Sequence, residues 1–468
     1  MSPGLATFAT LPDDELVQGI AEYLQPLMDF ASNVLAAKRD QFSTFPIYLR
    51  ATAGMRTLTT QDRARVINGV RSLFSNSTYS PFYFTEEQAR VLSGEEEAIF
   101  GWAGVNFLLG TLMEDSQGAG TVVNPRLTYG ALDLGGASTQ ISFYQPDQDI
   151  MANLFKLQIG QGKHWNLYAH SFLYYGINAA TERFEARLMN GQSPAERLVD
   201  GIHNPCLPGG ASKDVRTNIH FDSKNSETWD YSDNEYQLAT LKNSNAGGDY
   251  DKCSQYVKEL LHRDKGDWCQ FAHRGDCSYA GIYQPALPEQ SEHIGEFLAF
   301  SNYYHVFDFL NLPKRASLND LENATKKICA MSELELHNYA GHPSDDDDDD
   351  NLNPLINEMC FRSTYAMQLL HSGYGFKMED YITATNIVGG QKVGWTMGAI
   401  MYEINTLPWH YVASKPKINS PVDRHLETTI FLSALVLGMI FAVVAIFRAR
   451  ILAKRYQYEQ IKQIEVHG

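Results

Sequence analysis

Residues 132–140, with the sequence LDLGGASTQ, have the types and order that suit chemistry on a phosphate group. A short apolar segment ends in Asp133, two glycines follow, and Ser138 and Gln140 then supply a hydroxyl and an amide. Because glycine has no Cβ, its backbone amide can approach a phosphate closely. An adjacent aspartate can hold a hydrated divalent cation that offsets the phosphate charge. A β-hairpin with a Gly-Gly turn explains these residues equally well, so both interpretations stay open at this point.

A second segment, residues 94–102, places three glutamates directly before an apolar run. A carboxylate there could act as a general base toward a water molecule. The alternative is a helix whose acidic first turn interacts favourably with the helix dipole, and the spacing alone favours that alternative. A third short segment, residues 52–56, is a turn of small residues that ends in Arg56, whose guanidinium suits phosphate.

Other catalytic patterns are missing from the sequence. It contains no GxxxxGK[ST] phosphate loop and no HExxH zinc motif, and residues 136–140 lack the last glycine of a nucleophile elbow. The net charge of −17 argues against a protein that binds the nucleic-acid backbone, because such a protein needs a basic face. We therefore expect no nucleic-acid partner.

Helices and strands alternate in the pattern of the sequence. Apolar spacing predicts helices over residues 13–37 and 62–73, a strand over 46–50, and two strands around a glycine turn within 129–143. This alternation predicts the α/β class. The polar, glycine-rich residues 204–252 predict a surface excursion, and the six aspartates at 345–350 predict a solvated loop rather than a calcium site.

Residues 428–447 predict a transmembrane helix, because this uncharged run is about 20 residues long, which matches the thickness of a bilayer. Four basic residues follow between 448 and 455, so the positive-inside rule places the tail, 448–468, in the cytosol. We therefore expect a membrane protein, in contact with the lipid bilayer, whose body is extracellular or lies in the Golgi lumen. The first ten residues show no signal-peptide pattern.

The six cysteines all precede this predicted span and form no CxxC pair. That disfavours zinc ribbons and thioredoxin-like redox sites, and the even number suggests three disulfides in a non-cytosolic body. Two glycosylation sequons, at Asn76 and Asn323, fit the same interpretation.

Together these segments resemble, in order and spacing, the motifs of the apyrases, or ecto-nucleoside triphosphate diphosphohydrolases, which share the actin/Hsp70/hexokinase fold. The resemblance covers nearly the whole chain and rests on residues 51–56, 94–102, 131–140 and 394–398, with further similarity at 168–176 and 277–285. It implies two actin-like (RNase H-like) lobes with nucleotide between them. The first lobe would hold residues 1–93 and 387–425, and the second 94–386.

The resemblance also implies a role for individual residues in hydrolysing nucleoside tri- and diphosphates to monophosphate and inorganic phosphate. Glu97 would be the general base and Ser138 would orient the water, while Asp133 and Gln140 would hold Ca²⁺ or Mg²⁺ through its waters. The residues implied to contact phosphate or nucleotide are Thr52, Arg56, Gly135, Gly136, Ala137 and Trp395, with His305 at the position of the family's base-stacking aromatic. The implied disulfides are Cys206–Cys253, Cys269–Cys277 and Cys329–Cys360.

One motif of the family has no counterpart in the sequence. The family's first phosphate loop, Asp-x-Gly-Ser-Ser/Thr, and the N-terminal anchor before it are absent, because the chain opens at residues that resemble the sequence downstream. We therefore expect an incomplete first lobe and weak or no hydrolysis by this chain. The alternative function is an inactive nucleotide-binding ectodomain, and homo-oligomerisation is left open.

Overall fold

A computed structural model describes residues 4–112, 124–146, 154–158, 164–221, 229–231, 235–261, 277–291, 294–341 and 353–406. Residues 1–405 form one compact unit and 406–468 a second. The predicted transmembrane helix, the tail and the run of aspartates lie outside the described residues. Within the described ranges, no helix is both long enough and apolar enough to cross a membrane.

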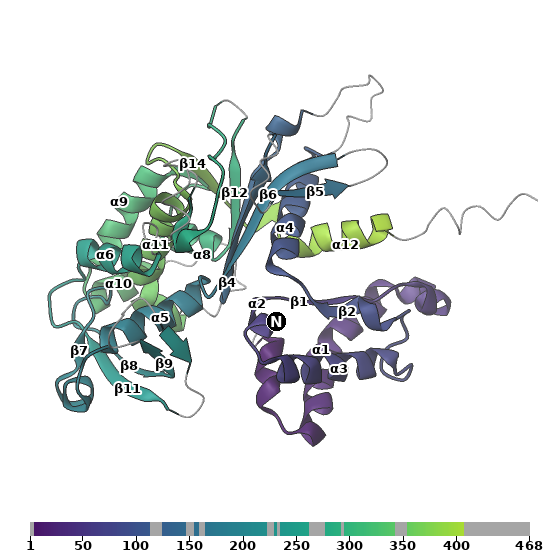
Figure 1. Cartoon of the computed structure of the whole chain (residues 1–468), viewed down its shortest axis with the longest axis horizontal. Coiled ribbons are helices and arrows are strands. Elements are labelled where there is room, and N and C mark those ends of the chain that lie inside the picture. The colour runs from purple at the N-terminus through teal and green to yellow at the C-terminus, as the bar shows by residue number, and fades with distance from the viewer. Residues whose placement is uncertain are drawn as a thin grey trace, which may run out of the picture. The chain divides into compact units, whose positions relative to one another are not determined.

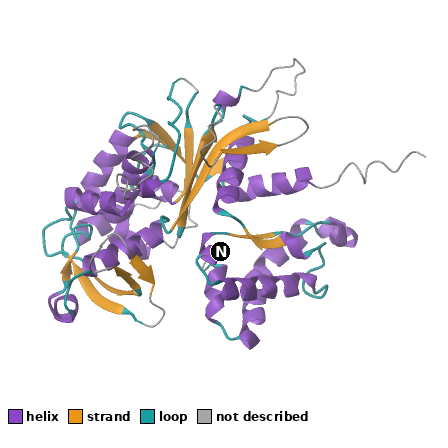
Figure 2. Cartoon of the chain, in the orientation of Figure 1, coloured by secondary structure: helices purple, strands orange, loops and turns teal. Residues whose placement is uncertain are grey.

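A seven-stranded sheet forms the centre of the first unit (Figures 1 and 2), with the strand order β13-β14-β12-β3-β4-β6-β5. Its strands are β3 (Gly130–Leu134), β4 (Ser138–Tyr144), β5 (Leu154–Gln158), β6 (His164–Leu173), β12 (Phe297–Ser301), β13 (Arg315–Ser317) and β14 (Tyr381–Ala384). β3, β12 and β14 run parallel to one another, so their carboxyl ends meet at one edge. The two predicted strands around a glycine turn are β3 and β4, which pair antiparallel.

Helices cover both faces of this sheet (Figure 1). One face packs on α4 (Gly94–Leu108), through a cluster that includes Trp102, Ala131 and Phe300. The other face, which includes Leu132 and Ile141, packs on the larger helical core. The helices of that larger core are α5 (Ile177–Met189), α6 (Tyr250–Leu261), α8 (Asn302–Phe309), α9 (Leu318–Cys329), α10 (Glu333–Ala340) and α11 (Met359–Gln368). Because side chains alternate along a strand, Asp133 shares the α4 face with Ala131.

The N-terminal part of the unit is mostly helical. α1 (Asp13–Val34) and α3 (Thr60–Ser75) pack on a two-stranded parallel sheet of β1 (Leu49–Ala51) and β2 (Ala89–Val91), with the short α2 (Ala53–Arg56) after β1. α1 and α3 confirm the two predicted helices. The strand predicted at 46–50 is shorter than expected and begins later, since β1 starts only at Leu49. Before it, Pro46 forms an isolated bridge with Tyr83.

The prediction of a surface excursion at residues 204–252 is wrong. This region contains strands and the start of a helix, with buried side chains that include Val215, Ala239 and Leu241. Its sheets are β7 (Ile202–His203) with β11 (Gln237–Lys242) and β8 (Ser212–Thr217), and β9 (Ile219–Phe221) with β10 (Trp229–Tyr231). Short strands separated by glycine and polar residues carry too little periodicity to be recognised from one sequence.

The C-terminal described segment contains the hairpin β15 (Ile387–Val388) and β16 (Gln391–Lys392) and then α12 (Trp395–Thr406). Close contact between this segment and α4 explains one glycine on each side: a Cβ at Gly398 would lie 2.0 Å from the Phe100 carbonyl oxygen, and a Cβ at Gly104 of α4 would lie 2.6 Å from the Gly394 carbonyl oxygen. The remaining short helical turns are η1 (Leu5–Thr10), η2 (Ala36–Thr44), η3 (Glu86–Gln88), η4 (Pro125–Leu127), η5 (Glu196–Asp200), η6 (Tyr279–Gly281), η7 (Asn353–Glu358) and η8 (Leu369–Tyr374). α12, expected in the first lobe, thus packs on a helix expected in the second; the lobe boundaries themselves stay predictions.

Two of the three predicted disulfides are formed as predicted, Cys206–Cys253 and Cys329–Cys360. Cys277 is also disulfide-bonded, but Cys269 lies outside the described residues, so that pairing stays a prediction. Both sequon asparagines, Asn76 and Asn323, are exposed.

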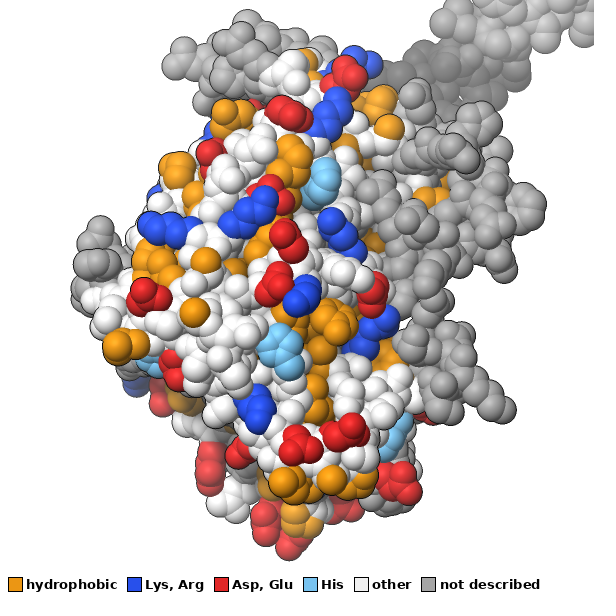
Figure 3. All heavy atoms as spheres, turned by 90° about the vertical axis from the view of Figure 1, so that its left-hand side faces the viewer, with side chains coloured by type: hydrophobic (Ala, Val, Ile, Leu, Met, Phe, Trp, Pro, Cys, Tyr) orange, Lys and Arg blue, Asp and Glu red, His pale blue; other side chains and the backbone are white. Residues whose placement is uncertain are grey.

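Charge on the surface is mixed. On the face that Figure 3 shows, the described Lys and Arg side chains are interspersed with Asp and Glu side chains rather than gathered into one patch. The absence of a nucleic-acid partner stays a prediction.

Candidate active site

The first turn of α4 gives its three glutamates different environments. Ser93 caps the helix, since its hydroxyl accepts a hydrogen bond from the Glu96 amide while the Glu96 carboxylate accepts one from the Ser93 amide. Glu96 also forms a bidentate ion pair with Arg90, at 2.7 and 2.8 Å. Glu96 is therefore occupied in holding the helix start, whereas Glu97 is buried.

A close approach between α4 and the sheet brings Glu97 inward. A Cβ at Gly94 would lie 2.3 Å from the Cβ of Ser171 on β6, so only glycine lets the helix begin this near the strand. Ser171 lies opposite Gln140 in the β4–β6 ladder and accepts a hydrogen bond from its amide at 2.9 Å.

Four predicted residues meet here, and we call them the Glu97 cluster: Arg56, Glu97, Ser138 and Gln140. Arg56 Nη2 donates to Glu97 Oε2 at 2.9 Å and to Ser138 Oγ at 3.1 Å. Gln140 Nε2 donates to the same two atoms, at 3.3 and 2.6 Å. Ser138 Oγ thus accepts twice, which leaves its own hydrogen to donate to another group.

Two opposing effects act on the pKa of Glu97. Burial raises the pKa of Glu97, and the neighbouring Arg56 guanidinium opposes this by stabilising the carboxylate.

Asp133, opposite Gln140 in the β3–β4 ladder, is the second buried carboxylate of the site. Burial, with a smaller contribution from the charge of Glu97, raises its pKa to about 7, while a hydrogen bond from the Ser301 side chain lowers it. Its Oδ1 atom is buried with no hydrogen-bond partner within the described residues. A buried oxygen in that state is costly unless a ligand satisfies it.

The backbone of the glycine turn is fixed from the side of α5. The carbonyl oxygens of Gly135 and Gly136 accept hydrogen bonds from the Ile177 and Asn178 amides, each at 2.9 Å. A Cβ at Gly176 would lie 2.5 Å from the Ala137 nitrogen, so the helix start requires glycine there. Of the three amides predicted to hold phosphate, that of Gly135 already donates to the Ser138 carbonyl oxygen at 3.0 Å.

Among the other predicted nucleotide contacts, Thr52 meets the Glu97 cluster through its backbone, since its carbonyl oxygen accepts a hydrogen bond from the Arg56 amide at 3.3 Å. Thr52 and Trp395 both line an apolar pocket of about 820 Å³ beside α1, β1 and α12, whose lining includes neither Arg56 nor Glu97. His305 lies on α8, where its ring is 5.3 Å from that of Tyr304. The roles predicted for these three residues stay predictions.

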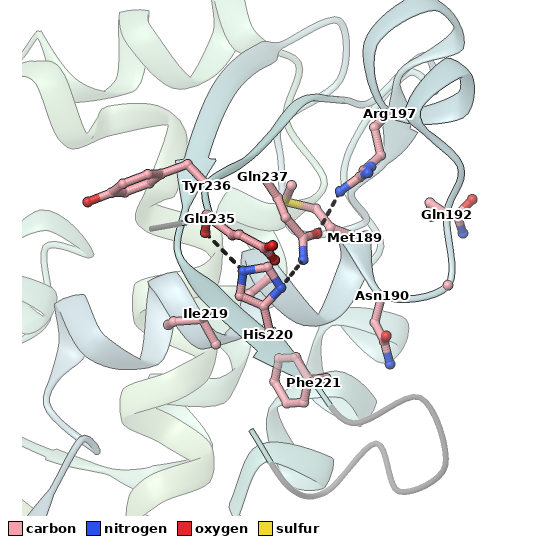
Figure 4. Close-up of a pocket in the computed structure, with 12 residues that line it drawn as sticks. Met189, Asn190, Gln192, Arg197, Ile219, His220, Phe221, Glu235, Tyr236 and Gln237 are labelled. Atoms are coloured by element: carbon pink, nitrogen blue, oxygen red, sulfur yellow. Dashed lines mark hydrogen bonds between the residues drawn. The ribbon is translucent and has the colours of Figure 1, made fainter. Parts of the chain in front are cut away.

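A second pocket, of about 580 Å³, lies away from all the predicted residues (Figure 4). His220 lies at its centre, between Gln237, whose Nε2 is 2.8 Å from His220 Nδ1, and the Glu235 carbonyl oxygen. Arg197 extends this row of hydrogen bonds by donating to Gln237 Oε1 at 2.6 Å. Among the described residues that line this pocket, there is no buried carboxylate and no pair of consecutive glycines like residues 135–136.

The whole chain is similar to proteins of known family. Residues 1–422 match the model of the GDA1/CD39 (nucleoside phosphatase) family. The chain belongs to this family. Ectonucleoside triphosphate diphosphohydrolase 1 of Bos taurus is 29% identical over 460 residues, covering 95% of this chain and 81% of that protein. Nucleoside-diphosphatase mig-23 of Caenorhabditis elegans is 26% identical, covering 87% of this chain and 70% of that protein.

The fold agrees with family membership. A crystal structure of nucleoside triphosphate hydrolases from Neospora caninum superposes with a TM-score of 0.54 at 18% identity, covering 84% of this chain and 79% of that one. That likeness supports the predicted actin-like α/β fold. Because the family match begins at residue 1 and spans nearly the whole chain, it does not support the expectation of a missing first motif and anchor.

The members of this family are expected to use a divalent cation, and Asp133 fits such a group. Its unpartnered Oδ1 is an oxygen ligand of the kind that Ca²⁺ and Mg²⁺ prefer. Within the described residues, no three His, Cys, Asp or Glu side chains converge on one point, so the protein does not offer an all-protein cage there. A cation at Asp133 would therefore keep several of its waters, as Mg²⁺ commonly does.

Sequence reasoning missed several residues that shape the site. Ser171 and Gly94 set the distance between α4 and the sheet, and Asn386, just after β14, accepts a hydrogen bond from the Ser301 amide at the end of β12. Ser93 and Glu96 could have been recognised, since Ser-x-x-Glu before an apolar run is a capping box. Ser301 and Asn386 carry no such signal, because they reach the site only through the pairing of distant strands.

Proposed function

We propose that this chain hydrolyses nucleoside triphosphates and diphosphates and releases inorganic phosphate. The observation that carries the proposal is the Glu97 cluster, in which a buried carboxylate, a guanidinium, a hydroxyl and an amide converge beside Asp133 and the glycine turn. Family membership and relatives named as nucleoside triphosphate diphosphohydrolases support it.

In the proposed mechanism Glu97 takes a proton from a water molecule that attacks the terminal phosphorus, while the bond from that phosphorus to the bridging oxygen breaks and the nucleotide leaves with one phosphate fewer. Ser138, which accepts from Arg56 and Gln140, can donate its own hydrogen to the water or to a phosphate oxygen. The amides of Gly136 and Ala137 bind phosphate oxygens at the turn. A bound Ca²⁺ or Mg²⁺ would supply charge that offsets the phosphate oxygens.

Arg56 has two roles in this proposal. Without substrate it pairs with Glu97 at 2.9 Å and stabilises the carboxylate. A phosphate group competes for the same guanidinium, because Arg binds phosphate well. When Arg56 turns to the phosphate, Glu97 loses its stabilising charge and becomes a stronger base at the moment a base is needed.

Localisation and surface modification are parts of the same proposal. We place the body of the protein in the Golgi lumen or outside the cell, anchored by residues 428–447 and glycosylated at Asn76 and Asn323. The two disulfides support an oxidising compartment. His305 and Trp395 remain our proposed contacts for the nucleotide.

Phosphate release is the direct test. Residues 1–468 would be expressed as they stand, checked for folding and assayed with ATP, ADP, UDP and GDP in CaCl₂, MgCl₂ or EDTA. We expect metal-dependent release that Glu97→Gln abolishes. A folded chain that binds a non-hydrolysable nucleotide but releases no phosphate would overturn the proposal and favour the inactive, binding-only alternative.

A further inference from the structure

The pairing between β4 and β6 ends irregularly beside the glycine turn. Ser138 lies opposite Leu173 in this antiparallel ladder. One step further out, the Tyr174 amide donates to the Ala137 carbonyl oxygen at 2.8 Å. In a regular ladder this pair would exchange two hydrogen bonds, and the Ala137 amide would donate back to the Tyr174 carbonyl oxygen. Within the described residues, the Ala137 amide makes no such hydrogen bond.

The backbone of Tyr174 explains why the second bond is missing. Its φ is 69°, in the left-handed region that residues other than glycine rarely adopt. The Tyr174 carbonyl oxygen accepts a hydrogen bond from Arg183 Nη1 at 3.1 Å instead of from β4. Strained residues of this kind persist only where the surrounding structure holds them, and they concentrate at functional sites. Arg183 is the side chain that holds this one.

Arg183, on α5, is a buried cation with a tightly defined position. It is 2% exposed, and its guanidinium carbon lies 4.5 Å from the ring centroid of Tyr175 and 5.0 Å from that of Trp229. Its Nη2 atom donates to the Leu260 carbonyl oxygen at 3.4 Å. A planar guanidinium between two rings has little freedom to turn. Burying a charge is costly, so a specific task explains this arginine better than stability does.

The released amide lies on the side of the turn that a ligand can reach. The Gly136 carbonyl oxygen accepts a hydrogen bond from the Asn178 amide of α5 at 2.9 Å. The C=O and N–H groups of one trans peptide point in opposite directions, so the Ala137 amide points away from α5. Residues 135–137 are half-buried rather than covered. An unused amide in such a turn is a donor for an anion.

We propose that Arg183 is a positioning residue for phosphate binding, because it holds the Tyr174 carbonyl oxygen out of the ladder and so keeps the Ala137 amide open for a phosphate oxygen. This inference rests on the proposed function, since it assumes that the glycine turn binds phosphate. Without Arg183, Tyr174 relaxes toward the extended conformation and its carbonyl oxygen takes the Ala137 amide, as in a regular ladder. The donor is then used within the protein before the substrate arrives.

The strain at Tyr174 provides a test that a merely structural arginine would fail. Arg183→Met removes the donor and keeps a long side chain between the rings, whereas Arg183→Lys keeps one donor. Tyr174→Gly in the Arg183→Met background should rescue the turn, because glycine adopts a positive φ without being held. Arg187→Met is the matched control, since Arg187 also links α5 to α6, through Glu259 at 2.7 Å.

The experiment makes two measurements on the full chain. Hydrogen exchange at the Ala137 amide is followed without nucleotide by mass spectrometry with fragmentation, and we expect it to be about tenfold slower in Arg183→Met than in the wild type. Phosphate release from ATP in CaCl₂ is the second, and we expect kcat/KM of Arg183→Met to fall by about 10²-fold, the effect of losing one preorganised donor. Arg183→Lys should lie between, the double variant should regain most of the loss, and Arg187→Met should match the wild type.

The outcomes separate this inference from the proposed function. If Arg183→Met hydrolyses ATP as fast as the wild type, Arg183 does not position the turn. A loss that Tyr174→Gly fails to restore would also overturn the inference, because Arg183 would then be merely structural. If Arg183→Met does not fold, Arg183→Lys and its double variant with Tyr174→Gly give the same comparison. A wild type that releases no phosphate overturns the proposed function, and equal exchange at Ala137 in the wild type and Arg183→Met then overturns the inference separately.

Discussion

The Glu97 cluster and the surroundings of Asp133 lie on the same face of the sheet, yet they satisfy their buried carboxylates in opposite ways. Glu97 has two nitrogen donors on one oxygen, from Arg56 and Gln140. Asp133 has a buried oxygen without a partner in the described part of the chain, and burial raises its pKa to about 7. An oxygen of one buried carboxylate is thus paired with protein donors, whereas a buried oxygen of the other has no partner among the described residues.

This difference suggests a division of labour. A carboxylate that must exchange a proton benefits from partners that adjust its pKa and that substrate can displace. A carboxylate that must hold a cation benefits from an unsatisfied oxygen, at a cost in stability that the ligand offsets. The predictions below test whether these two carboxylates really differ in this way.

The largest effect should come from Glu97→Gln. The amide keeps the shape and can still accept from Arg56, but it cannot take a proton, so we expect kcat to fall by about 10²–10⁴-fold. The calcium-dependent rise in Tm should stay close to that of the wild type. Steady-state phosphate release measures kcat, and thermal unfolding measures the calcium-dependent rise in Tm.

The adjacent Glu96→Gln is the control for this variant. Glu96 is engaged with Arg90 and Ser93, so its loss should weaken the helix start and leave kcat within a few-fold of the wild type. A greater loss of turnover in Glu96→Gln than in Glu97→Gln would show that the wrong carboxylate has been assigned as the base.

Asp133→Asn should separate stability from function. A folded-state pKa raised from 3.8 to about 7 means that ionised Asp133 destabilises the fold, by at most about 4 kcal/mol. This penalty is absent below pH 4, grows between pH 4 and 7, and is complete above pH 7. The neutral asparagine avoids it.

We therefore expect Asp133→Asn, in EDTA, to unfold at a higher temperature than the wild type at pH 8 but not at pH 4. The variant should also lose the calcium response. Thermal unfolding at pH 4, 6 and 8 measures both effects. A variant that is less stable than the wild type at pH 8 would mean that Asp133 is satisfied within the protein, and the contrast with Glu97 would disappear.

Arg56→Gln should shift a pH profile rather than abolish activity. Arg56 lowers the pKa of Glu97, so its removal should raise that pKa, and the acidic limb of kcat/KM should move to higher pH. The rate should also fall because a phosphate contact is lost. Arg90→Gln, which removes the partner of Glu96 instead, should leave the acidic limb unchanged. If the acidic limb of the kcat/KM profile were the same in Arg56→Gln and in the wild type, Arg56 would not control the pKa of Glu97.

The sequence predicts local features of this site better than those that depend on strand pairing. The strands around the glycine turn, the helices α1 and α3, and two disulfide pairs agree with expectation. The choice of Glu97 among three consecutive glutamates came from family resemblance, since spacing alone favoured a plain helix start. The structure adds a physical reason, because Glu96 is used in the capping box and Glu97 is not.

Other features could not be read from the sequence. Ser301 precedes a helix and would be interpreted as its cap, yet its side chain makes no capping hydrogen bond, and its amide donates to Asn386, 85 positions later in the chain. Asn386 reaches Ser301 only because β14 pairs with β12. Local propensity contains no information on these pairings, which are set by how the whole sheet assembles.

The smallest effect on chemistry should come from Gly398→Ala, which tests how each carboxylate is supported. Glu97 sits on α4, whose Phe100 carbonyl would lie 2.0 Å from the new Cβ, so α12 must move away. Overpacking of this kind costs about 1–3 kcal/mol, so the Tm should fall and kcat should drop several-fold. Asp133 is held by strands instead, so the calcium response should persist. Gly394→Ala is the matched control, because a Cβ there meets nothing within 4 Å. If Gly398→Ala removed the calcium response as completely as it lowered kcat, the two carboxylates would depend on one support, and the distinction between them would fail.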